Sequence, residues 1–160
     1  VDDMLLESIS RQLIAEVKSS LLKEFQLTDS GECKFLLNMS ITRVTSGDTL
    51  GQPRYVKDLL ERFDMLECKP AVTPCLVSKL PVLQRSTIAV PYRELVGGLN
   101  YLATCTRPDI SFAVQLLSRH LLGFGEEHWL AAKRVLRYLK GTMNYVLMYR
   151  SSVSDAADLL

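Results

Sequence analysis

Two apolar helical faces separated by a proline constrain the fold of this 160-residue chain more than any other feature. Before the proline, apolar residues between Leu95 and Ala103 recur at steps of three and four, which predicts a helix with one buried face. Pro108 disfavours helical geometry at Arg107, so the first helix is expected to end there. Apolar residues between Ile110 and Leu117 then form the face of a second helix.

A third helix is expected from Glu126 to Lys140, where apolar residues again share one side and Gly141 supplies a stop signal. Gly97 and Gly98 lie inside the first of the three helices, where glycine costs stability. We interpret them as positions that another backbone approaches closely. Residues 92–141 are thus predicted to form a mainly α-helical bundle of about three helices.

The first part of the chain mixes helix and strand patterns. Residues Ser8 to Phe25 carry an apolar stripe at helical spacing, and Lys34 to Thr42 alternate like a strand. A turn at Ser46 to Asp48 is expected to return the chain as a second strand from Thr49 to Gln52. Pro53 to Phe63 has the pattern of a helix that begins with proline.

The remaining segments complete an α+β assignment. Four prolines predict that residues 65–91 form an extended connector, and alternation between Asn144 and Tyr149 predicts a last strand. The predicted division is 1–64 for the strand-containing part, 65–91 for the connector, 92–141 for the helical bundle, and 142–160 for the last strand and tail.

The composition excludes several classes of protein. A net charge of +1 means that any nucleic-acid site must rest on a local patch. Four cysteines without a CxxC pair, and two isolated histidines (His120 and His128), argue against zinc and for the reduced thiols of an intracellular protein. There is no signal peptide and no apolar run long enough to cross a membrane, so we expect a protein that is neither secreted nor membrane-bound.

The central helices also carry a family resemblance. The stretch VPYRELVGGLNYLATCTRPDISFAVQLLSR, followed by EEHWLAAKRVLRYLKGT, resembles the region downstream of the polymerase palm in copia-type retrotransposon polyproteins. The connector segment CKPAVTP is similar to that family as well. The opening residues, Val1-Asp2-Asp3, resemble the end of the family's YVDD hairpin.

The resemblance implies a piece of a Pol polyprotein: the C-terminal part of the reverse transcriptase palm, a thumb-like helical region and the first strand of RNase H. The parent would be an RNA-directed DNA polymerase that acts on a template–primer and dNTPs in virus-like particles of the cytoplasm, or in the nucleus. Asp2 and Asp3 would be catalytic and would hold two Mg²⁺ ions, with Mn²⁺ as a substitute. Taken alone, this aspartate pair is far more typical of a solvated turn, and only the family resemblance favours a metal site. Because the family's other catalytic aspartate and its fingers are absent, we expect the isolated chain to be inactive.

Two sets of residues are candidates for nucleic-acid contacts. A basic strip follows one side of the third helix, and like charges at this spacing favour an anionic partner. The alternative is a solvated basic face near a helix C-terminus. Two polar residues beside the expected hairpin are candidates for the primer strand, or are simply exposed side chains. The strip comprises Lys133, Arg134, Arg137 and Lys140, and the hairpin candidates are Gln52 and Arg54.

Asn38 stands where the family usually has glycine, and asparagine is the best substitute if the backbone there has a positive φ. This departure leaves open an inert transposon relic, and the basic strip leaves open a nucleic-acid-binding fragment without chemistry.

Overall fold

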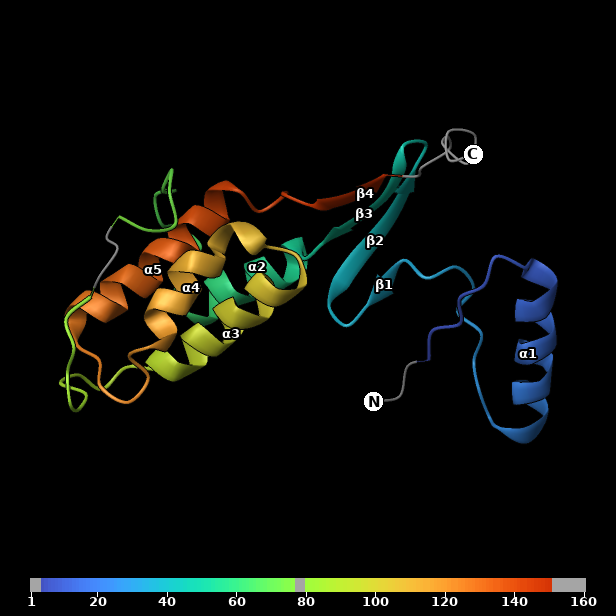
Figure 1. The fold of residues 1–160 in the computed structure, drawn as a ribbon, viewed down its shortest axis with the longest axis horizontal. Helices are drawn as coiled ribbons and strands as arrows, with labels where there is room; N and C mark the ends of the chain where they lie inside the picture. The colour runs from blue at the N-terminus through green and yellow to red at the C-terminus, as the bar shows by residue number, and fades with distance from the viewer. Residues whose placement is uncertain (1–3, 77–79, 151–160) are drawn as a thin grey trace, which may run out of the picture.

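The computed structural model describes residues 4–76 and 80–150, and it confirms the α+β fold class. Four of its helices cluster together, an antiparallel sheet projects from them, and a further helix stands alone at the opposite end of the molecule (Figure 1). In chain order the elements are α1 (Arg11–Glu24), β1 (Phe35–Leu36), β2 (Met39–Val44), β3 (Gly47–Gly51), α2 (Pro53–Arg62), α3 (Tyr92–Cys105), the 3₁₀ helix η1 (Pro108–Ile110), α4 (Ser111–Ser118), α5 (Glu126–Gly141) and β4 (Leu147–Arg150).

The sheet has the strand order β1-β2-β3-β4, and every neighbouring pair is antiparallel. Ile41 lies opposite Leu50 in the β2–β3 hairpin, and Leu50 lies opposite Leu147 of β4. These three side chains therefore share one face of the sheet. Strand β4, which follows the helices, thus pairs with a hairpin strand that lies almost one hundred residues earlier in the chain.

The single strand expected from Lys34 to Thr42 is wrong. A two-residue turn at Leu37 and Asn38 divides it into β1 and β2, and both residues have a positive φ, 49° and 59°. Tight hairpin turns require positive φ at both central positions, and asparagine tolerates it well. The expected backbone conformation at Asn38 is therefore confirmed. The alternating pattern continues through the turn, so periodicity alone did not reveal it.

Helices α2, α3, α4 and α5 share one hydrophobic core. Helix α2 precedes the connector but packs against α5, so helices from both sides of the connector enclose the same apolar interior. The largest side chains of this core, all at most 2% exposed, are Leu59, Leu60, Tyr92, Leu95, Leu99, Leu102, Ile110, Leu117, Leu136 and Leu139.

The expected close approach of a backbone at Gly97 and Gly98 is wrong. A Cβ atom on Gly97 would meet nothing within 4 Å, and one on Gly98 would meet a side-chain atom, Cδ2 of Leu59, at 2.8 Å. The close backbone approach occurs instead at Gly123, where a Cβ would collide with the carbonyl group of Leu83 in the connector. Gly123 therefore lets the connector pass directly over the loop between α4 and α5.

Helix α1 forms as its pattern predicts, with Ser10 as its N-cap, but none of its residues is buried. Its apolar stripe faces outward: Leu13 is 51% exposed and Phe25, just after the helix, is 61% exposed. Exposed apolar stripes of this kind are typical of surfaces that another polypeptide covers. No helix in the described part of the chain is long and apolar enough to cross a membrane.

Candidate nucleic-acid interface

The expected metal ligands, Asp2 and Asp3, lie outside the described residues. Within residues 4–76 and 80–150, no three side chains of the His, Cys, Asp or Glu type come close enough to bind a metal together.

The basic strip on α5 lies against the connector. Three of its four cations donate hydrogen bonds to residues of the connector, and the backbone N–H of Ala71 donates in return to the carbonyl of Arg137 at 3.1 Å. The strip thus fastens the connector to α5, whether or not it also meets nucleic acid. The three bonds run from Arg134 Nη2 to Thr73 Oγ1 (3.0 Å), from Arg137 Nε to the carbonyl of Lys69 (2.7 Å) and from Lys140 Nζ to the carbonyl of Leu66.

Lys133 differs from the other members of the strip. Its Nζ lies 5.3 Å from the centre of the Trp129 ring, which is the distance of a cation–π contact. It makes no hydrogen bond or ion pair with any other described residue. Among the described residues, Lys133 is therefore the cation of the strip that is held by a ring and not by a hydrogen bond.

The two hairpin candidates have opposite environments. Gln52 is 2% exposed, and its Oε1 accepts a hydrogen bond of 2.7 Å from Thr106 Oγ1. Its Nε2 is buried without a partner among the described residues. Arg54, in the first turn of α2, is exposed and has no ion pair within the described ranges. The side chain of Arg54 is therefore open to solvent, whereas that of Gln52 lies in the interior.

A polar cluster around Arg107 was not predicted from the sequence. The guanidinium is 3% exposed and binds both carboxylate oxygens of Asp109, at 3.0 and 2.8 Å. It also donates to the carbonyl and the hydroxyl of Thr142, at 3.0 and 2.5 Å. Burial by itself raises the pKa of Asp109, but hydrogen bonds from Arg107 and Tyr138 outweigh this, and the pKa lies below its ordinary value. The only sequence signal for this cluster was an arginine and an aspartate two residues apart.

The expectation that the two histidines are isolated is wrong. The rings of His120 and His128 lie 4.4 Å apart, centre to centre, and both residues are buried. His128 is fully paired: its Nδ1 accepts from the backbone N–H of Gly125 at 3.1 Å, and its Nε2 lies 2.9 Å from the carbonyl of Pro81. That pairing fixes His128 as part of the α5 N-terminus rather than as a metal ligand.

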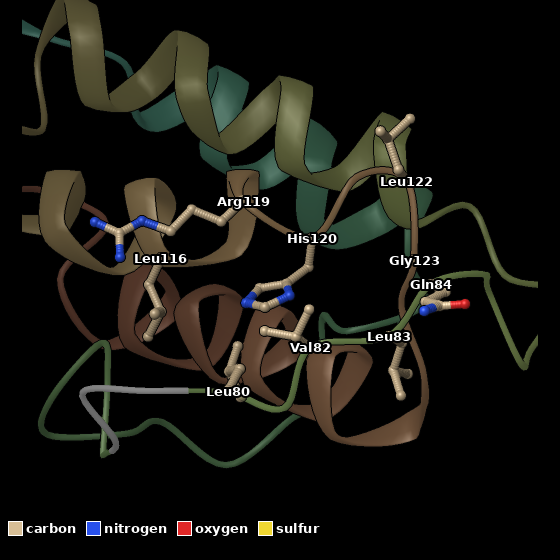
Figure 2. A pocket seen from close by; sticks show the side chains of 9 residues that line it. All are labelled: Leu80, Val82, Leu83, Gln84, Leu116, Arg119, His120, Leu122 and Gly123. Carbon is tan, nitrogen blue, oxygen red and sulfur yellow. The ribbon is translucent and has the colours of Figure 1, made fainter.

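Beside His120 there is an open hollow of about 440 Å³ between the connector and the end of α4. Figure 2 shows the His120 ring reaching towards the connector residues Leu80 and Val82, which line the hollow together with Leu116. The lining is mostly aliphatic, and Arg119, Gln84 and His120 are its polar members.

Comparison with known proteins identifies relatives along nearly the whole chain. A model of the family "Reverse transcriptase (RNA-dependent DNA polymerase)" matches residues 1–77. The Pol polyprotein of transposon TNT 1-94 from Nicotiana tabacum is 40% identical over 95% of this chain, a region that makes up 12% of that relative. The Pol polyproteins of transposons RE1 and RE2 from Arabidopsis thaliana are 41% and 39% identical over 91% of this chain and 10% of their own length.

The chain spans only about a tenth of the length of these polyproteins. The similarity to them covers both the strand-containing part and the helices, because it extends over nine-tenths of the chain. No solved structure matches the chain.

Proposed function

Because the chain belongs to the reverse transcriptase family of copia-type retrotransposon Pol polyproteins, we propose that it is a segment of an RNA-directed DNA polymerase. The observation that carries the proposal is the 40% identity to the TNT 1-94 polyprotein over 95% of the chain. In this segment, residues 1–64 would be the C-terminal part of the palm and residues 92–141 the thumb-like region. The rest of the Pol polyprotein is its structural partner, and the exposed stripe of α1 supports this because it offers an uncovered apolar surface.

Asp2 and Asp3 would bind the catalytic metal ions together with carboxylates from the rest of the polyprotein. Adjacent carboxylates supply the hard oxygen ligands that Mg²⁺ prefers, and Mn²⁺ accepts the same donors. When bound, two such ions stabilise the charge on the attacking and leaving oxygens of nucleotidyl transfer. The isolated chain would lack this activity because it carries only part of the ligand set.

The template–primer would lie against the helices and the hairpin through contacts to its phosphate backbone. Arg54 and Lys133 are suited to this role, since neither cation is paired with a carboxylate in the described part of the chain. Backbone contacts of this kind set position and orientation without reading sequence, as a polymerase requires.

The test is primer extension by a chimeric Pol polyprotein in which this chain replaces the aligned segment of the TNT 1-94 polyprotein. We expect templated incorporation of dNTPs with Mg²⁺ that is lost in Asp2→Asn and Asp3→Asn. Asp58→Asn is the matched control, because Asp58 is an exposed acid of α2. A chimera without templated incorporation, or one that extends primers equally well with Asp2→Asn, would contradict the proposal.

The second candidate is a module that binds nucleic acid without chemistry, and the unpaired cation of Lys133 favours it. The 160-residue chain itself would then bind an RNA–DNA hybrid, and Lys133→Ala would weaken binding. Arg134→Ala and Arg137→Ala are poor probes because both also release the connector from α5. An affinity that does not change with Lys133→Ala would exclude this role for the strip.

A further inference from the structure

Two short chain segments join the sheet to the helical core. The first link, residues 51–53, runs from β3 into α2, and the second link, residues 142–146, runs from α5 to β4. Figure 1 shows both links leaving the helical cluster on the same side, where β3 and β4 lie next to each other. These links connect the elements along the chain, and the Tyr101 hydroxyl on α3 also donates to the carbonyl of Leu37 in the β1–β2 turn. The links and this hydrogen bond together set the angle at which the sheet projects.

Adjacent residues at the end of α3 each hold one link. Thr106 donates a hydrogen bond from Oγ1 to Gln52 Oε1 in the first link, at 2.7 Å. Arg107 donates to the carbonyl and the hydroxyl of Thr142 in the second link, at 3.0 and 2.5 Å. Thr106 and Arg107 are both 2% exposed, so these bonds lie in the interior.

Aromatic rings complete the enclosure of Arg107. Its guanidinium carbon lies 5.7 Å from the centre of the Tyr138 ring on α5 and 5.5 Å from that of Tyr145 in the second link. The Tyr138 hydroxyl donates to Asp109 Oδ2 at 2.8 Å, which orients the carboxylate that Arg107 binds. A planar guanidinium is needed here, because a lysine ammonium cannot form the bidentate pair and stack between rings at once.

The links also touch each other. A Cβ on Gly51 would meet Cγ1 of Val146 at 2.8 Å, so the second link packs directly against the end of β3. A change in the second link is therefore transmitted to the hairpin, and Arg107 is the side chain that holds this link most extensively.

We propose that Arg107 is a positioning residue that holds the β2–β3 hairpin at a fixed angle to the helices, so that both can contact one template–primer duplex. The part of this inference that concerns the duplex rests on the proposed function. Arg107 itself is buried and touches no substrate; it acts through Thr142 and Tyr145 of the second link.

Residual dipolar couplings of the 160-residue chain test the angle directly. In the unsubstituted protein, the amides of β2 and β3 and those of α2 to α5 should fit one alignment tensor. In Arg107→Lys, the couplings of the hairpin should be scaled down relative to those of the helices. Couplings are measured on folded molecules, so a mere loss of stability does not reproduce this result. A single common tensor in Arg107→Lys would overturn the proposal.

Arg62→Lys is the matched control, because Arg62 pairs with Glu94 at 3.2 Å on the surface, where both side chains are more than half exposed. It should keep the common tensor. If Arg107→Lys does not fold, Thr142→Val decides the question with the same two outcomes, since it removes the hydroxyl that accepts from Arg107 and that itself donates to the carbonyl of Tyr138.

The duplex part of the inference is tested in the chimeric polyprotein. Arg107→Lys should raise KM for template–primer several-fold while Arg62→Lys leaves it unchanged, and equal KM values would overturn that part. Failure of the unsubstituted chimera to extend a primer would refute the proposed function and leave the result from the couplings intact.

Discussion

The ring of His120 lies 4.4 Å from that of His128, and only one of the two has a complete set of hydrogen-bond partners among the described residues. His128 is fixed by Gly125 and Pro81. Burial lowers the pKa of His120, and the nearby His128 and Arg119 lower it further. A protonated His120 is therefore unfavourable in the folded protein.

This arrangement predicts an acid-sensitive fold. A histidine whose folded-state pKa lies below its unfolded value of about 6.5 keeps its full contribution to stability above that pH. The contribution is lost as the pH falls through the folded-state pKa, because the unfolded chain binds the proton more readily. A pH titration followed by ¹H–¹⁵N NMR should give a pKa for His120 below about 6.5. A value at or above the ordinary one would contradict this account.

Asp109 should show its effect at neutral pH. Asp109→Asn leaves the buried Arg107 without a charged partner, and we expect a loss of about 1–3 kcal/mol in unfolding free energy at pH 7. The pKa of Asp109 is lowered in the folded state, so its stabilisation is present above the unfolded value of about 3.9 and disappears as the pH falls through the folded-state value. Urea unfolding of the unsubstituted protein and of Asp109→Asn should therefore give a smaller difference in unfolding free energy at pH 3 than at pH 7. An equal difference at the two pH values would refute the assignment.

The two adjacent glycines of α3 should respond in opposite directions to alanine. Gly98→Ala places a methyl group 2.8 Å from Cδ2 of Leu59, which is 2% exposed, and should destabilise the protein by about 1–3 kcal/mol. Gly97→Ala meets nothing within 4 Å and should stabilise it by about 0.5–1 kcal/mol through helix propensity. Thermal unfolding of both variants and of the unsubstituted protein measures the two changes in stability. Similar effects of the same sign would show that the packing around α3 is not as described.

Leucines in α1 and in the core should differ sharply in their contributions. Leu99 is fully buried, so Leu99→Ala should lower the unfolding free energy by about 2–5 kcal/mol. Leu13 is 51% exposed on a helix with no buried residue, so Leu13→Ala should change the unfolding free energy of the 160-residue chain by less than about 0.5 kcal/mol. A large cost for Leu13→Ala would mean that α1 packs against the rest of the chain in solution.

Helices were well predicted from the sequence wherever their buried face was continuous. The expected helices at 53–63 and 126–140 match α2 and α5 within one residue at each end. Their apolar spacing follows the helical repeat because these faces line one core. The helix expected at 8–25 also forms, as α1, although it begins three residues later at Arg11 and its apolar stripe is exposed. Periodicity reports local structure and not what covers it.

Features that depend on contacts between distant residues were missed. Nothing in the local sequence reveals that Arg107 reaches Thr142, since the two are far apart in the chain. The close backbone approach was expected at Gly97 and Gly98 but occurs between Leu83 and Gly123. A glycine inside a helix stands out in the sequence, whereas a glycine in a loop does not.

The candidate site was only partly accessible to sequence reasoning. Spacing along α5 correctly placed four cations on one helix, but it could not show that Arg134 and Arg137 would bind connector groups. Gln52 was expected to contact the primer or to be exposed because it is a polar residue beside the hairpin, yet Thr106 and the core enclose it. The nucleic-acid contacts of these residues stay predictions.

The salt dependence of template–primer affinity in the chimeric polyprotein tests most directly whether the helices of the core bind the phosphate backbone of nucleic acid. The logarithm of affinity should fall linearly with the logarithm of salt concentration, and Lys133→Ala should reduce the slope by about 0.7–0.9, the loss of one phosphate contact. Lys57→Ala, which removes an exposed lysine already paired with Glu61 at 3.5 Å, should leave the slope unchanged. Equal slopes for Lys133→Ala and Lys57→Ala would contradict the account.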